Sequence, residues 1–150
     1  RLSGKEVRIV VDATQELLTS VLKYHPFLIK PNNHELGEIF EKTLETEEEI
    51  IHYAKKLQEM GARNVLVSMA AQGSILITEE QEIYKMGVAK GEVKNSVGAG
   101  DSMVAGFLAG YLERRDYAYA LKLGTAAGGA TAFSDDLATK EAIQQVLQQL

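Results

Sequence analysis

The sequence predicts an α/β fold with a mainly parallel sheet and helices on both of its faces. Short runs rich in β-branched and other apolar residues, such as 7–12 and 64–69, are typical of buried parallel strands. Longer segments with apolar residues at helical spacing lie between these runs. Strands that alternate with helices predict βαβ units, and such units build a parallel sheet that helices cover.

The first part of the chain is expected to hold a strand, a helix, a strand and two helices, over residues 7–12, 14–24, 26–30, 35–40 and 47–61. Pro31 closes the second strand, because the residue before a proline is restricted to extended conformations. The last of these helices has glutamates in its first turn, where the helix dipole favours them. Gly61 is its expected C-terminal stop.

The second part begins with a third strand over residues 64–69. Two further strands, 74–78 and 82–88, are expected to form a pair joined by a tight turn at Glu79 and Glu80. After Gly100 we expect helix, in three pieces broken near two aspartates, Asp116 and Asp135. In the first piece a face of small residues predicts tight packing against a neighbour; its members are Ala105, Gly106, Ala109 and Gly110.

Composition limits the functions to be considered. The chain has 150 residues, 45% hydrophobic and 25% charged, which suits one domain with a core of average size. The net charge of −5 argues against an extended nucleic-acid surface. The absence of cysteine rules out disulfides and thiolate chemistry, and no apolar run is long enough to cross a bilayer. We therefore expect a cytoplasmic protein without nucleic-acid or membrane partners.

The start of the chain is unusual. Arg1 to Gly4 lead at once into a strand, with no initiator methionine and no N-terminal segment. We therefore expect the chain to be a fragment of a longer domain.

Ligands of open α/β sheets bind at the carboxyl ends of the strands. The segments to search are therefore 12–14, 30–35, 68–73 and 95–101. Asp12 and Asn32 could be helix N-caps only, and Gly73 could serve a turn only. The expected convergence of these segments at one edge of the sheet favours a ligand site.

The last of these segments, NSVGAGD, is the most informative. It matches neither a P-loop nor a dinucleotide fingerprint. Gly98, Ala99 and Gly100 have little or no side chain, and they precede a helix expected to start at about Asp101. Their backbone N–H groups can therefore form an anion hole. Asp101 could be an N-cap, but beside an anion hole it also suits a base that deprotonates a hydroxyl attacking phosphorus.

The stretch NSVGAGDSMVAGF resembles the C-terminal signature of the ribokinase-like sugar kinases of the PfkB family. The resemblance implies a three-layer αβα sandwich of which this chain is the C-terminal, nucleotide-binding and catalytic part. The sugar-binding part and the β-stranded lid, through which a homodimer could form, would lie outside the chain. In this family the motif's aspartate is the catalytic base and the preceding amides form the anion hole, which carries over to Asp101 and to Gly98, Ala99 and Gly100.

Two other segments resemble motifs of the same family. KPNNHEL is similar to its NxxE element, which implies that Lys30 and Asn32 bind the nucleotide and that Glu35 holds Mg²⁺ through water. VSMAAQGS is similar to its VSLGxxG turn, which contacts the phosphates of ATP. The residues concerned are Ser68, Met69, Ala70, Ala71, Gln72 and Gly73. Ala70 stands where the family has its first glycine.

The tail ATAFSDDLATKEAI, together with the GAGD segment, looks most like bacterial 1-phosphofructokinases. The resemblance implies a phosphotransferase that uses ATP to phosphorylate a hydroxyl of a sugar phosphate. The implied reaction converts fructose 1-phosphate to fructose 1,6-bisphosphate. The fragment alone is expected to be inactive. A tagatose-6-phosphate kinase is the nearest alternative, and a non-catalytic nucleotide-binding module is an alternative of another class. A metal-dependent hydrolase is disfavoured because the histidines lack ligand spacing. Residues 126–133 could contact adenine or could serve helix packing only.

Overall fold

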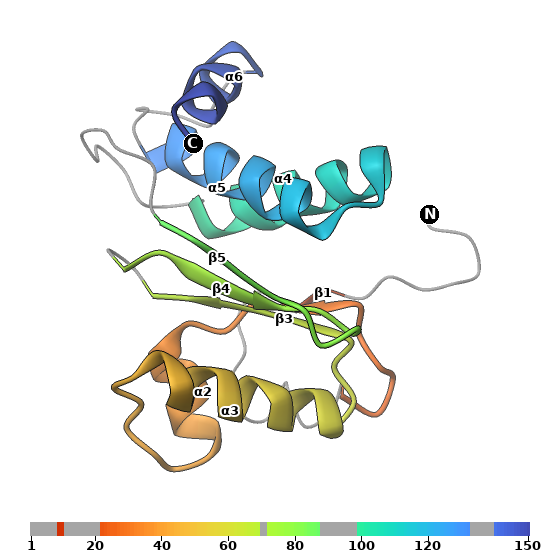
Figure 1. The fold of residues 1–150 in the computed structure, drawn as a ribbon, viewed down its shortest axis with the longest axis vertical. Helices are drawn as coiled ribbons and strands as arrows, with labels where there is room; N and C mark the ends of the chain where they lie inside the picture. The colour runs from red at the N-terminus through yellow and green to blue at the C-terminus, as the bar shows by residue number, and fades with distance from the viewer. Residues whose placement is uncertain (1–8, 11–21, 70–71, 88–98, 133–139) are drawn as a thin grey trace. The chain divides into compact units, whose positions relative to one another are not determined.

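The computed structural model describes residues 9–10, 22–69, 72–87, 99–132 and 140–150 (Figure 1). The chain forms two compact units, Arg1–Lys85 and Met86–Leu150.

A five-stranded sheet, in the order β1-β2-β3-β4-β5, organises the first unit (Figure 1). Its strands are β1 (Ile9–Val10), β2 (Leu28–Ile29), β3 (Asn64–Ser68), β4 (Ser74–Ile77) and β5 (Ile83–Met86). β1 pairs with β2, and β2 with β3, in parallel, as the alternation of strands and helices predicts. β4 runs antiparallel to β3, with Val65 opposite Ile77, so the sheet is mixed. The predicted tight connection between β4 and β5 is confirmed.

Both described helices of the first unit begin with a reciprocal capping box. In α2 (Asn33–Ile39) the box joins Asn32 and Glu35, and in α3 (Glu47–Glu59) it joins Thr46 and Glu49. The capping side chain of Asn32 explains why α2 begins earlier than its apolar residues predict.

Gly61 lies just after the C-terminus of α3, as predicted. Its φ is +135°, which a side chain rarely tolerates. A Cβ at this position would overlap the carbonyl oxygen of Leu22. Glycine is therefore required here both by the backbone conformation and by a close approach of another segment.

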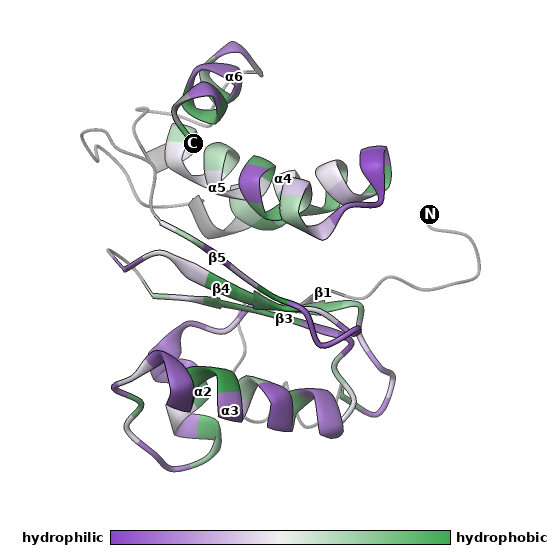
Figure 2. Ribbon diagram, viewed as in Figure 1, coloured by the Kyte–Doolittle hydropathy of each residue, from purple (hydrophilic) through white to green (hydrophobic). Residues whose placement is uncertain are grey.

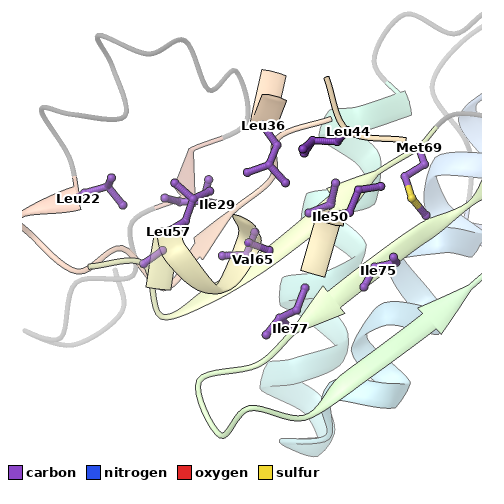
Figure 3. Close-up of a cluster of buried hydrophobic side chains, with 13 residues drawn as sticks. Leu22, Ile29, Leu36, Leu44, Ile50, Leu57, Val65, Met69, Ile75 and Ile77 are labelled. Carbon is purple, nitrogen blue, oxygen red and sulfur yellow. The ribbon is translucent and has the colours of Figure 1, made fainter. Parts of the chain in front are cut away.

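The core of the first unit lies between one face of the sheet and the helices α2 and α3 (Figures 1 and 3). The helices contribute Leu36, Ile50 and Leu57, and the strands contribute their buried aliphatic side chains, among them Ile29, Val65, Val67, Ile75 and Ile77. Figure 2 shows the outer side of α3 as hydrophilic, so the helix is amphipathic. β3 and β4 are buried at nearly every residue.

The described part of the second unit consists of three helices, α4 (Ala99–Arg114), α5 (Tyr117–Ala132) and α6 (Lys140–Gln149). The predicted break near Asp116 is confirmed, because Asp116 Oδ1 accepts hydrogen bonds from the amides of Ala118 and Tyr119 at 2.9 and 3.2 Å and so caps α5. Asp135 lies outside the described residues.

The small-residue face of α4 is only partly as predicted. A Cβ on Gly106 would lie 2.8 Å from the Cβ of Ala127, and one on Gly110 would lie 3.0 Å from the Cα of Ala120, so both glycines meet α5. Ala105 and Ala109 are exposed instead. They do not share the contact because each is offset by 100° around the helix from the glycine that follows it.

The structure also bears on two other expectations. Ala126 and Ala130 pack against α6 in a cluster with Val146, so helix packing accounts for these two members of segment 126–133. Within the described residues, no helix is both long enough and apolar enough to cross a membrane.

Candidate active site

The carboxyl ends of β2 and β3 bring two of the predicted segments together. Asn32 forms an isolated parallel bridge with Ser68. The amide of Ser68 donates a hydrogen bond to the carbonyl oxygen of Pro31 at 3.0 Å. The structure therefore places segment 30–35 beside the start of segment 68–73, as expected for two neighbouring parallel strands that end at one edge.

Asn32 and Glu35 form the capping box of α2. Asn32 Oδ1 accepts from the amide of Glu35 at 2.7 Å, and Glu35 Oε1 accepts from the amide of Asn32 at 2.8 Å. None of the described residues donates a hydrogen bond to the other carboxylate oxygen, Oε2. The capping role of Asn32 is thus observed, and it leaves one oxygen of a half-buried carboxylate available for a further ligand.

Lys30 follows β2 directly and is buried, with 9% of its surface exposed. No carboxylate of the described residues forms an ion pair with it. Buried ammonium groups are stable when they are paired with an anion or well hydrogen-bonded. Lys30 therefore has the environment of a residue that can hold an anionic ligand.

Segment 68–73 forms the turn between β3 and β4. The amide of Met69 donates to the carbonyl of Gly73 at 2.8 Å, and the amide of Gln72 donates to the carbonyl of Met69 at 2.9 Å. Gly73 has a φ of +97°, so its role in the turn is observed. The side chain of Met69 packs in the hydrophobic core, whereas Ser68 is half-buried and Gln72 is exposed. Ala70 and Ala71 lie outside the described residues.

In the second unit, the structure begins α4 at Ala99, so that Ala99, Gly100 and Asp101 are its first three residues. The N–H groups of a first helical turn have no acceptor within the helix and point along the positive end of its dipole. The expected donors, the backbone N–H groups of Ala99 and Gly100, therefore lie at a helix N-terminus. The helix begins two residues earlier than predicted. Gly98 and segment 12–14 lie outside the described residues.

A contact that sequence reasoning missed follows directly after Asp101. The hydroxyl of Thr131, near the end of α5, donates to Ser102 Oγ at 2.8 Å. The two residues are 29 positions apart in sequence, so no local sequence signal indicates the contact.

The described residues contain no group of three or more His, Cys, Asp or Glu side chains that could hold a metal ion by itself. A magnesium ion that is held mainly by phosphates and water requires only one or two carboxylates, and Glu35 Oε2 suits such a contact.

Comparison with known proteins identifies the family. The sequence model of the pfkB family carbohydrate kinases matches residues 2–142. A 1-phosphofructokinase of Bacillus subtilis (strain 168) is 47% identical over 146 residues, which are 97% of this chain and 48% of that protein. A D-tagatose-1-phosphate kinase of Bacillus licheniformis is 37% identical over 146 residues, again 97% and 48% of the two chains.

Among solved structures, phosphofructokinase-2 of Escherichia coli, in complex with substrates and products, superposes with a TM-score of 0.85 at 26% identity. The match covers 97% of this chain and 48% of that one, and it confirms the ribokinase-like α/β fold. The chain spans about half the length of the relatives it matches. Because the family model covers nearly the whole chain and a relative with 47% identity is aligned over almost all of it, the chain belongs to the pfkB family of carbohydrate kinases.

Proposed function

We propose that this chain is the nucleotide-binding and catalytic part of an ATP-dependent kinase that converts fructose 1-phosphate to fructose 1,6-bisphosphate. The observation that carries the proposal is the position of Asp101 in the first turn of α4, directly after the amides of Ala99 and Gly100, in a member of a carbohydrate kinase family. A base beside a group of anion-binding donors is what phosphoryl transfer to a hydroxyl requires.

The reaction follows from these parts. Asp101 accepts the proton of the sugar hydroxyl, and the hydroxyl oxygen forms a bond to the γ-phosphorus of ATP in line with the leaving oxygen of ADP. The amides of Gly98, Ala99 and Gly100 neutralise the charge on the transferring phosphoryl group. Losing one such oriented donor costs about 3–4 kcal/mol of barrier in other enzymes. The geometry of the first turn of α4 therefore decides the rate.

By similarity to the family motifs, segments 30–35 and 68–73 of the first unit bind the nucleotide. Lys30, buried and without an ion pair among the described residues, binds an ATP phosphate. Backbone groups of segment 68–73 contact the phosphates, and Asn32 fixes the start of α2. Glu35 would hold Mg²⁺ through water by its Oε2 atom, and a bound Mg²⁺ would supply charge neutralisation to the phosphates.

The choice of sugar rests on similarity. The identity to a 1-phosphofructokinase is 47%, against 37% to a D-tagatose-1-phosphate kinase. The alternative considered from the sequence, a tagatose-6-phosphate kinase, is not favoured, because this tagatose relative is named for the 1-phosphate. Fructose 1-phosphate is therefore the proposed substrate, and D-tagatose 1-phosphate is its closest competitor.

The test uses the full-length protein and an assay of ADP release. We expect the highest kcat/KM with fructose 1-phosphate, compared with D-tagatose 1-phosphate, tagatose 6-phosphate and fructose 6-phosphate.

Asp101→Asn removes the base and should lower kcat about 10²- to 10⁴-fold, with the KM for ATP little changed. Asp116→Asn is the matched control, because asparagine also caps a helix and Asp116 lies at the start of α5. Near wild-type turnover of Asp101→Asn would refute the base. Binding of ATP without turnover of any sugar phosphate would favour the non-catalytic module.

A further inference from the structure

The first turn of α4 is held by a side-chain hydrogen bond from another helix. The hydroxyl of Thr131 in α5 donates to Ser102 Oγ at 2.8 Å, and Ser102 is the residue directly after Asp101. Thr131 is buried, with 2% of its surface exposed, and Ser102 is half-buried. Because the bond is shielded from water on the Thr131 side, its loss would not be fully compensated by solvent.

The packing of α4 against α5 explains why these two residues meet. A Cβ on Gly124 would lie 2.7 Å from the carbonyl oxygen of Met103, and one on Gly106 would lie 2.8 Å from the Cβ of Ala127. The two backbones therefore approach closely along the first half of α4, and the helices run antiparallel. The end of α5 consequently lies beside the start of α4, where Thr131 reaches Ser102.

A first helical turn needs such support from outside the helix. Its N–H groups have no intrahelical acceptors, and helix ends fray more easily than helix centres. Catalysis, by contrast, needs donors and a base that are fixed before the reaction begins. A hydrogen bond to the residue after Asp101 acts on the same turn that carries Ala99 and Gly100.

We propose that Thr131 is a positioning residue for phosphoryl transfer, which acts through Ser102 on the first turn of α4. Its hydroxyl fixes the backbone on which Asp101 and the amide donors of Ala99 and Gly100 are carried. This inference rests on the proposed function, since the donors and the base matter only if the full-length protein is a kinase. It adds a residue that has no place in the NSVGAGD motif itself.

The same helix contains a threonine that serves as an internal control. Thr125 is also buried, with 8% exposed, but its hydroxyl donates to the carbonyl oxygen of Leu121 within α5, at 2.8 Å. Thr125→Val and Thr131→Val thus remove the same group from the same buried helix. Of the two, only Thr131→Val removes the hydrogen bond to Ser102 in α4.

The experiment measures steady-state kinetics and thermal unfolding of the full-length enzyme and of Thr131→Val, Thr131→Ser and Thr125→Val. For Thr131→Val we expect a fall in kcat of about tenfold to 10²-fold, since small misplacements of reacting groups have effects of this size. The KM for ATP should stay within about twofold, because ground-state binding is not disturbed. Thr131→Ser keeps the hydroxyl and should recover most of kcat, and Thr125→Val should retain the wild-type kcat.

A second set of variants covers the case in which Thr131→Val fails to fold. Ser102→Ala removes the acceptor and should lower kcat to a similar extent. The double variant Ser102→Ala with Thr131→Val should be no slower than the slower single variant, because each substitution breaks the same Thr131–Ser102 hydrogen bond.

Three results would overturn the inference while leaving the proposed function intact. The first is an active wild-type enzyme in which Thr131→Val and Thr125→Val have equal kcat. The second is a rise in the KM for ATP at unchanged kcat, which would make Thr131 a nucleotide contact. The third is full additivity in the double variant. A full-length wild-type protein that phosphorylates no sugar phosphate would instead refute the proposed function itself.

Discussion

Asn32 and Glu35 each accept a hydrogen bond from the backbone amide of the other, at 2.7 and 2.8 Å. This pair explains the start of α2, and it uses only one oxygen of the Glu35 carboxylate. The capping function and the proposed contact to magnesium therefore involve different atoms of one side chain. A substitution that keeps the capping hydrogen bond but removes the proposed contact to magnesium can separate the two functions.

Glu35→Gln is that substitution. A glutamine at this position of a capping box still accepts the amide hydrogen bond, so the unfolding temperature should change little. The loss of negative charge should raise the magnesium concentration for half-maximal rate by about tenfold or more, in the range found when groups that support a metal's ligands are removed. A magnesium titration of the full-length enzyme at saturating ATP measures this.

Glu49→Gln is the matched control for Glu35→Gln, because Glu49 has the same place in the capping box of α3. It should leave the magnesium requirement unchanged. If Glu35→Gln also leaves it unchanged, Glu35 serves capping only.

Glu49 also gives a prediction about pH. Hydrogen bonds from the amides of Glu45 and Thr46 lower its pKa below the ordinary 4.5. A carboxyl group whose pKa is lowered by folding stabilises the folded state above its unfolded-state pKa. That contribution is lost as the pH falls through the lower, folded-state value.

Wild type should therefore resist urea better than Glu49→Gln at pH 7, and the difference should disappear well below pH 4. Urea unfolding of both proteins at the two pH values provides the test. A difference that persists unchanged in acid would show that the charge of Glu49 is irrelevant.

Gly124→Ala tests the close approach of α5 to α4. The new Cβ would lie 2.7 Å from the carbonyl oxygen of Met103 and 3.2 Å from the Cβ of Phe107. Backbone and buried side chain cannot move away freely, so we expect destabilisation by about 1–3 kcal/mol despite the better helix propensity of alanine. Chemical denaturation measures it. Gly87→Ala is the control, because nothing lies within 4 Å of a Cβ there. Equal stability of the two variants would contradict the packing.

Gly100→Val tests the proposed anion hole. Gly100 has helical backbone as the second residue of α4, so a valine meets no conformational barrier at this position. The unfolding temperature should therefore be nearly unchanged. The side chain should block the approach of a phosphoryl oxygen to the amides and lower kcat at least about 10²-fold. Parallel thermal melts and rate measurements separate the effects, and a destabilised but fully active variant would argue for a role in folding alone.

The sequence by itself determined the local elements of this protein. Two helices begin at capping boxes whose members lie within four residues of each other, Asn32 with Glu35 and Thr46 with Glu49. Asp116 likewise caps the start of α5 through nearby amides. The tight turn between β4 and β5 is equally local. The GAGD segment, read as a resemblance, led to the family that the comparisons confirm. Local signals suffice in these cases because the interacting groups are neighbours in the chain.

Tertiary structure decided the rest. β4 runs antiparallel to β3, the side chain of Met69 lies in the core, and only the glycines of the small-residue face of α4 meet α5. The bridge between Asn32 and Ser68 and the hydrogen bond from Thr131 to Ser102 join residues that are far apart in sequence. No local pattern specifies such contacts, because they depend on which elements pack together and in which register. The support of the first turn of α4 is therefore visible only in the folded chain.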